Sequence, residues 1–75
     1  MKGEMREIAS TGDTKVIWDT ENSDEVEAAE KQFDLLKKKG FKAYAVKKNG
    51  EPGKEIKKFD EEAGMIIMVP TIVGG

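Results

Sequence analysis

The sequence contains neither cysteine nor histidine, and these two absences exclude several kinds of chemistry. Without cysteine the chain forms no disulfide and offers no thiolate as a nucleophile or metal ligand. Without histidine it lacks the usual general base, the commonest metal ligand and the side chain that titrates near neutral pH. We therefore expect a protein that is not an enzyme, with no catalytic residues, no metal site and no cofactor of its own.

Long apolar runs, aromatic residues and known catalytic motifs are also scarce. Aromatic residues make up 7% of the chain, and its longest apolar run is far shorter than the roughly 18 residues of a membrane span. The N-terminus does not resemble a signal peptide. The sequence has no glycine-rich phosphate loop, nucleophile elbow or zinc-ligand spacing. These absences predict a cytoplasmic protein without a membrane partner.

Charge is what the chain has in abundance. Of its 75 residues, 37% are charged and 37% are hydrophobic, which predicts one small folded domain spanning residues 1–75. Residues 1–30 carry three basic and nine acidic groups, whereas residues 31–58 carry ten basic and three acidic groups. This basic middle can present a surface to an acidic partner. Its candidate residues are Lys47, Lys48, Lys57 and Lys58. Few aromatic residues adjoin these lysines, so we do not expect nucleic-acid binding.

The N-terminal segment leaves two alternatives open. Thr14 to Asp19 has the β-branched and aromatic content of a strand. Its Trp18 is expected in or beside the core, or else as a binding anchor. Met5 to Ala9 gives a weaker strand signal. If that strand forms, the turn-rich residues 10–13 join the two strands in a hairpin; otherwise residues 1–12 are a loose tail.

A helix is predicted from about Asp24 to Lys39. Asn22 is a candidate N-cap, with Ser23 or Asp24 as alternatives, and Gly40 supplies the left-handed residue that ends the helix. Apolar residues recur along it at intervals of three and four and form one stripe. These residues are Val26, Ala29, Phe33 and Leu36. The helix should therefore pack on a sheet through this stripe.

Three further strands are expected after the helix. Residues 41–47 form a strand in which Phe41, Ala43 and Ala45 share one face and Tyr44 and Val46 the other, and alternation alone does not decide which face meets the helix. Residues 54–59 form a short, highly charged edge strand. Met65 to Val69 are five consecutive apolar residues, which predict a strand buried on both faces. The acidic turn at residues 60–62 is expected to be solvated. The order predicts an α+β domain in which one helix packs on a mixed sheet of four strands, or of five if Met5 to Ala9 pairs.

The chain ends in a segment that contrasts with the charged sequence before it. Pro70 has no amide to donate to a sheet, so we expect regular pairing to end there and residues 71–75 to form a C-terminal arm. The arm ends in Gly74 and Gly75, and glycine lets a backbone enter a narrow channel because it has no Cβ. A terminal carboxylate is ionised at neutral pH and is a poor acyl donor, so it would need activation before any covalent role.

This ending resembles that of the ubiquitin-like sulphur carriers, especially the small subunit of molybdopterin synthase. The matching features are the acidic, glycine-containing turn of residues 60–64, the apolar strand, Pro70 and the terminal diglycine. The resemblance implies a β-grasp-like fold. It also implies two partners, an adenylating enzyme that activates Gly75 with ATP and an acceptor protein. Gly75 would then carry sulphur as a thiocarboxylate or form an amide with a lysine.

Two hypotheses follow for the function. In the first, the protein is a non-catalytic carrier or modifier that acts through Gly75, and the apolar strand and arm dock the partner. The docking residues would be Met68, Val69, Pro70, Thr71, Ile72, Val73 and Gly74. In the second, the protein is a small adaptor that binds a protein through its sheet and helix surfaces, with no covalent chemistry.

Overall fold

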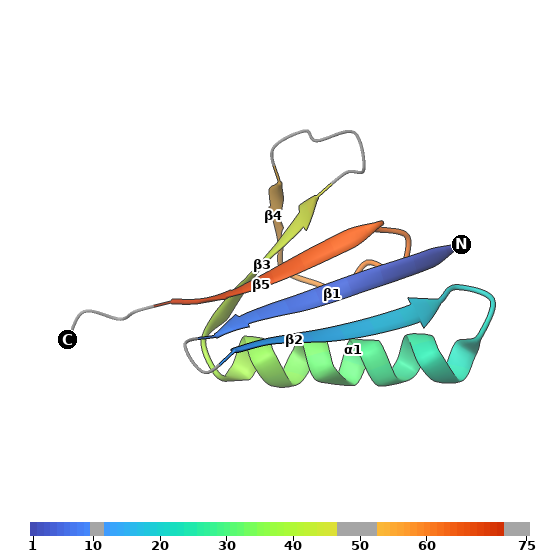
Figure 1. Ribbon diagram of the computed structural model, residues 1–75, viewed down its shortest axis with the longest axis horizontal. Helices are drawn as coiled ribbons and strands as arrows, with labels where there is room; N and C mark the ends of the chain where they lie inside the picture. Colours follow the sequence, from blue (N-terminus) through green and yellow to red (C-terminus); the bar gives the residue numbers. More distant parts are fainter. Residues whose placement is uncertain (10–11, 47–52, 72–75) are drawn as a thin grey trace.

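The computed structural model describes residues 1–9, 12–46 and 53–71. Five strands and one helix make up this part of the chain (Figure 1). In chain order they are β1 (Lys2–Ala9), β2 (Gly12–Asp19), α1 (Ser23–Lys38), β3 (Phe41–Val46), β4 (Lys54–Ile56) and β5 (Met65–Pro70). Among the described residues, no helix has the length and apolar character needed to cross a membrane.

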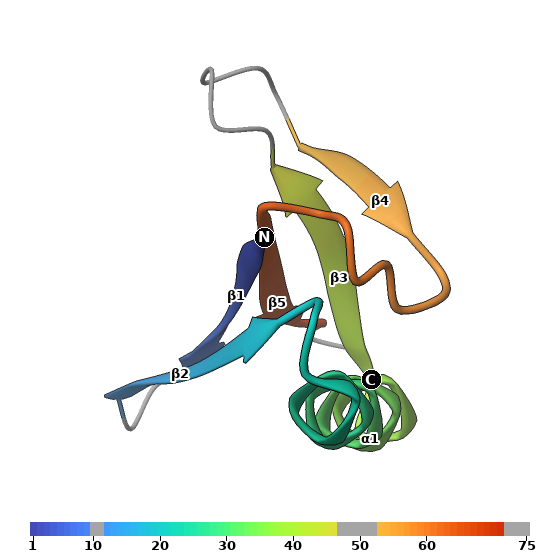
Figure 2. The ribbon, with the colours of Figure 1, turned by 90° about the vertical axis from the view of Figure 1, so that its right-hand side faces the viewer.

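The strands form one mixed sheet in the order β2-β1-β5-β3-β4. β1 and β5 run parallel, and the other neighbouring strands run antiparallel. α1 lies across one face of this twisted sheet and contacts β2 and β3 (Figures 1 and 2). The predicted α+β class is confirmed, with five strands, and the arrangement is consistent with a β-grasp-like fold.

β1 resolves the first open alternative, because it lies inside the sheet between β2 and β5. Its Met5 is buried and pairs with Val16 on one side and Ile66 on the other. The alternative of a loose N-terminal tail is therefore wrong. Its strand signal was weak because Glu4 and Arg6, on the face away from the helix, leave few apolar residues in the segment.

The helix begins and ends close to the predicted positions. The side-chain oxygen of Asn22 accepts hydrogen bonds from the backbone N–H groups of Asp24 and Glu25, at 3.1 and 3.3 Å. The Glu25 carboxylate accepts a hydrogen bond from the Asp19 N–H at 2.9 Å, which ties the helix start to the end of β2. At the other end Gly40 has a φ of 98°, a left-handed value that favours glycine.

The core lies between α1 and the covered face of the sheet. Among the described residues, those buried in it are Met5, Trp18, Ala29, Phe33, Leu36, Ala43, Ile66 and Met68. Trp18 has no exposed surface, so it belongs to the core and is not a binding anchor. The faces of β3, which alternation left undecided, are assigned by Ala43, which is buried against the helix layer.

Two predicted strands differ from the structure. β4 ends at Ile56, and Phe59 lies beyond it, with its ring 5.0 Å from the Trp18 ring and 5.8 Å from the Phe33 ring, centroid to centroid. Phe59 therefore lies outside the strand and packs against the core. β5 is not buried on both faces either. Ile66 and Met68 are buried beneath the helix, whereas alternate residues are half-buried on the opposite face, which no described helix or strand covers (Figure 2).

Candidate functional site

The chain leaves the sheet at the C-terminal end of β5, in the middle of the fold. Pro70 pairs with Phe41 at the start of β3. The next residue, Thr71, donates its backbone N–H to the Gly40 carbonyl at 3.3 Å, and its hydroxyl donates to the same oxygen. Since Gly40 follows Lys39, the C-cap of the helix, the start of the arm is fixed to both the sheet and the end of α1.

The structure separates the residues expected to dock a partner. Pro70 and Thr71 are exposed, and Val69 is half-buried on the uncovered face of the sheet. Met68, in contrast, has no exposed surface because its side chain points to the helix. Met68 is thus a core residue and not a docking residue, which corrects that expectation. The remaining residues of the arm, at positions 72–75, lie outside the described residues.

The expected basic surface is described only in part. Lys57 and Lys58 follow β4 and are exposed, whereas Lys47 and Lys48 lie outside the described residues. Other lysines reach the surface near the start of the arm. Lys38 and Lys39 lie at the end of α1, and Lys42 lies opposite Val69 in the sheet.

The face of the sheet opposite the helix, here called the open face, is an apolar surface that the sequence did not single out. Side chains alternate between the two faces along each strand. Once the register shows which residues face the helix, the remaining residues of each strand can be assigned to the open face. Its exposed or half-buried apolar residues are Ile8, Ile17, Tyr44, Val46, Met65, Ile67 and Val69. Ile17 exposes 56% of its surface and Ile8 exposes 44%.

One charged cluster lies on the open face. The Glu4 carboxylate accepts a hydrogen bond from the Arg6 side chain and forms an ion pair with Lys15 at 3.2 Å. The hydrogen bond from Arg6, assisted by Lys15, lowers the pKa of Glu4 below its ordinary value, against a smaller opposing effect of desolvation. A single carboxylate between two cations leaves this part of the open face positively charged.

We predict that this cluster contributes to the pH dependence of stability. Because the pKa of Glu4 is lower in the folded protein, its contribution is complete above the unfolded value of about 4.3 and is lost as the pH falls through the folded value. Glu4→Gln should therefore flatten the acid side of the stability curve, measured by urea denaturation from about pH 6 to about pH 3. Arg6→Gln should flatten it too; an unchanged curve for both variants would contradict the assignment.

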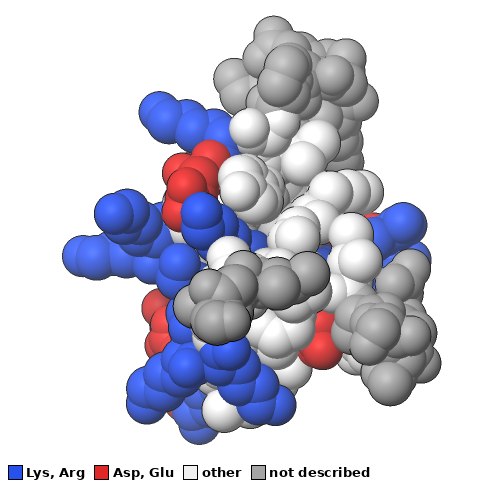
Figure 3. All heavy atoms as spheres, turned by 90° about the vertical axis from the view of Figure 1, so that its left-hand side faces the viewer, with Lys and Arg blue, Asp and Glu red and all other residues white. Residues whose placement is uncertain are grey.

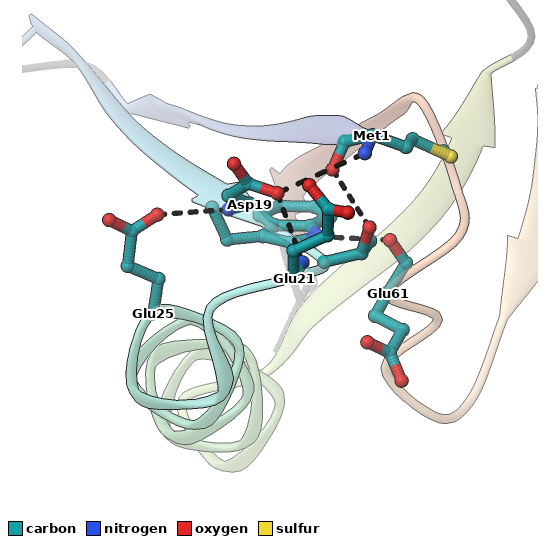
Figure 4. A network of polar contacts seen from close by, with 7 residues as sticks. Met1, Asp19, Glu21, Glu25 and Glu61 are labelled. Atoms are coloured by element: carbon teal, nitrogen blue, oxygen red, sulfur yellow. Dashed lines mark hydrogen bonds and ion pairs between the residues drawn. The ribbon is translucent and has the colours of Figure 1, made fainter.

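The acidic turn after Phe59 has a structural role at the opposite end of the sheet (Figure 4). The Glu61 carbonyl accepts a hydrogen bond from the Trp18 indole N–H at 2.9 Å. The Asp60 carboxylate accepts one from the Glu62 N–H at 3.0 Å. Figure 4 also shows Met1 and Asp19 beside this link, where the Met1 carbonyl accepts hydrogen bonds from the N–H and hydroxyl of Thr20. Among the described residues, no group of carboxylates is arranged to hold a metal ion.

A shallow cleft of about 500 Å³ lies between α1 and this turn. Val26, Ile56 and Phe59 contribute its apolar lining. Its polar lining consists of carboxylates and one lysine, from Glu30, Lys58, Asp60, Glu61 and Glu62. This set contains no hydroxyl or thiol nucleophile, so the end of β5 and the open face are the better candidates for function.

Comparisons with known proteins do not extend this description. No protein-family model matches the chain, and no curated protein or solved structure gives a significant match. The candidate site therefore depends on the geometry of the described residues and on the sequence of the arm.

Proposed function

We propose that this protein is a ubiquitin-like carrier or modifier that acts through the carboxylate of Gly75. The observation that carries the proposal is the placement of the arm. The arm continues from the central strand β5, at a point fixed by the Pro70–Phe41 pairing and by the bonds from Thr71 to Gly40. The four residues after Thr71 can span at most about 14 Å, which is enough to enter a catalytic channel on another protein.

The β-grasp-like sheet supports the same proposal. In the sulphur carriers that the ending resembles, the last strand precedes a diglycine, and here β5 occupies the centre of the sheet between β1 and β3. A central strand is hydrogen-bonded on both sides, so it resists displacement when a partner pulls on the residues that follow it. The start of the arm would stay fixed while its tip is bound.

The chemistry needs an external enzyme. An adenylating enzyme would transfer AMP from ATP to the Gly75 carboxylate and release pyrophosphate. Hydrosulphide from a sulphur donor would then displace AMP and give a thiocarboxylate, or a lysine amine of an acceptor would displace AMP, lose a proton and give an amide. Both outcomes need only an accessible carboxylate on a slender chain, which glycine at positions 74 and 75 allows.

The proposal is tested by intact-mass spectrometry of the protein with ATP and a candidate adenylating enzyme from the same genome. We expect the mature chain to end at Gly75 and to gain the mass difference between sulphur and oxygen, or to form an adduct through that residue. Deletion of Gly74 and Gly75 should abolish the product, and one alanine appended after Gly75 should do the same. Lys54→Ala, an exposed change outside the arm, is the matched control and should react normally.

The open face favours a second candidate function, that of a protein-binding adaptor without covalent chemistry. A contiguous apolar patch on a sheet surface is typical of sites that another protein covers. In that case Ile8→Asp with Ile17→Asp would abolish the cellular function, and the deletion of Gly74 and Gly75 would leave it intact. The carrier proposal is wrong if this pattern is observed.

A further inference from the structure

Four lysines lie close in sequence to Gly40, the residue that holds the start of the arm. Lys37, Lys38 and Lys39 immediately precede Gly40, and Lys42 follows it by two residues; together they are called the lysine cluster. Gly40 is also the residue whose carbonyl binds Thr71, the first residue of the arm. The lysine cluster and the start of the arm therefore lie at the same end of the domain.

The charge of this surface is not neutralised within the described part of the chain. None of the four lysines forms an ion pair with a described residue, whereas Lys15 and Lys31 are paired with Glu4 and Glu27. Lys38, Lys39 and Lys42 are exposed, and Lys37 is half-buried. Figure 3 faces this end of the molecule and shows lysine and arginine side chains gathered along one side of it.

Helix electrostatics account for only part of the lysine cluster. Lys37, Lys38 and Lys39 lie at the negative end of the helix dipole, which favours cations there. Lys42 lies in β3, outside the helix, so the dipole gives no reason for a cation at that position. Four like charges within six consecutive residues repel one another, and this repulsion is relieved when opposite charges bind.

We propose that the lysine cluster is the docking surface for an acidic patch on the protein that receives the arm. This inference rests on the proposed function and names the chemistry of its partner. Complementary charges around the start of the arm would orient it as the two proteins meet and would raise the association rate, more at low salt than at high salt.

The surroundings of the lysine cluster favour a protein over a nucleic acid or a membrane. Lys42 lies opposite Val69, and both belong to the apolar open face, which suits a partner with mixed apolar and acidic groups. The exposed side of α1 that leads to the lysine cluster carries four carboxylates and one lysine, Lys31, which is paired with Glu27; the carboxylates are those of Asp24, Glu27, Glu30 and Asp34. These carboxylates would repel a phosphate backbone or an anionic membrane that approached along the helix.

The test is an NMR titration of the full chain labelled with ¹⁵N, using poly-glutamate as the acidic probe. We expect shifts at the amides of Lys38, Lys39, Lys42 and Thr71, and an affinity that falls about tenfold between about 50 mM and about 200 mM salt. The triple variant K38E/K39E/K42E should bind the probe at least about tenfold more weakly. Lys2, Lys31 and Lys54 provide the matched control, since K2E/K31E/K54E makes the same change in charge at exposed positions outside the lysine cluster and should weaken binding less than about twofold.

Three results would overturn the inference. One is an equal loss of binding in both triple variants, which would mean that overall charge is sensed. The second is tighter binding of single-stranded DNA than of poly-glutamate, and the third is tighter binding of phosphatidylserine vesicles. Because the titration involves neither ATP nor Gly75, it can fail while the adenylation test succeeds, and the reverse is also possible.

Discussion

Replacing Trp18 with alanine should lower the free energy of unfolding by about 3–5 kcal/mol, the range for removing a large aromatic residue from a core. Trp18 has no exposed surface, and its ring packs edge-on against Phe59. A domain of this size is expected to have only about 5 kcal/mol of stability in total. Trp18→Ala should therefore leave a large fraction of the protein unfolded at 37 °C, measured by circular dichroism during urea denaturation.

Two further variants separate the causes of this loss. Trp18→Phe keeps an aromatic ring beside Phe59 but leaves the Glu61 carbonyl without the indole donor, and it should cost about 1–3 kcal/mol. Ile17→Ala is the matched control, because Ile17 is the adjacent residue and exposes 56% of its surface. It should change stability by less than about 0.5 kcal/mol. If Trp18→Ala is no more destabilising than Ile17→Ala, the assigned core is wrong.

Gly3→Ala should also be strongly destabilising, although it adds a single methyl group. Gly3 pairs with Trp18 across β1 and β2, and the indole lies over it. A Cβ at position 3 would lie 2.3 Å from Trp18 Cζ2 and 2.4 Å from Cε2, far closer than van der Waals contact. Because the indole is enclosed in the core, it cannot move away freely, and we expect a loss of about 1–3 kcal/mol, measured by urea denaturation.

A double-mutant cycle tests whether this contact is the cause. The smaller ring of Trp18→Phe frees space above position 3, so the double variant should be more stable than the sum of the two single changes predicts. We expect a coupling of about 1 kcal/mol or more. Lys2→Ala, at an exposed neighbouring position, is the control and should show no coupling. Strictly additive effects would show that Gly3 is needed for another reason.

These core variants lie away from the proposed functional surface. Trp18 and Gly3 are near the start of β1, whereas the lysine cluster and Thr71 lie at the opposite end of the sheet. Stability and function can therefore be tested with separate sets of variants. A surface variant that loses binding but unfolds at the normal urea concentration would identify a contact with a partner.

The sequence was sufficient for elements whose signals are local. The helix has an N-cap at Asn22, a regular apolar stripe and Gly40 at its end, and each of these acts within a few residues. β2, β3 and β5 were recognisable from their β-branched, aromatic and apolar residues. The fold class followed from the order of these elements, because an amphipathic helix beside several strands must bury its stripe against a sheet.

The sequence was not sufficient where partners are distant in the chain. β1 has a polar open face, and its place became clear only from pairing with β2 and with β5, about 60 residues away. Phe59 was predicted to lie in a strand, but it packs against Trp18 and Phe33 outside β4. These two residues belong to β2 and α1, so the sequence around Phe59 does not reveal the contacts. Met68 was expected at the surface because an unbroken apolar run does not reveal which of its residues face the helix.

By itself, the sequence determined that the chain has no thiol and no imidazole chemistry and that Gly74 and Gly75 follow a strand and Pro70. These properties depend only on which residues are present and in what order. The tertiary structure decided that β5 is the central strand, that the start of the arm is fixed to Gly40, and that Lys42 lies opposite Val69 in the sheet. The reason is physical: strand order and register are set by burying apolar side chains from distant segments in one core, and no short stretch of sequence contains that information.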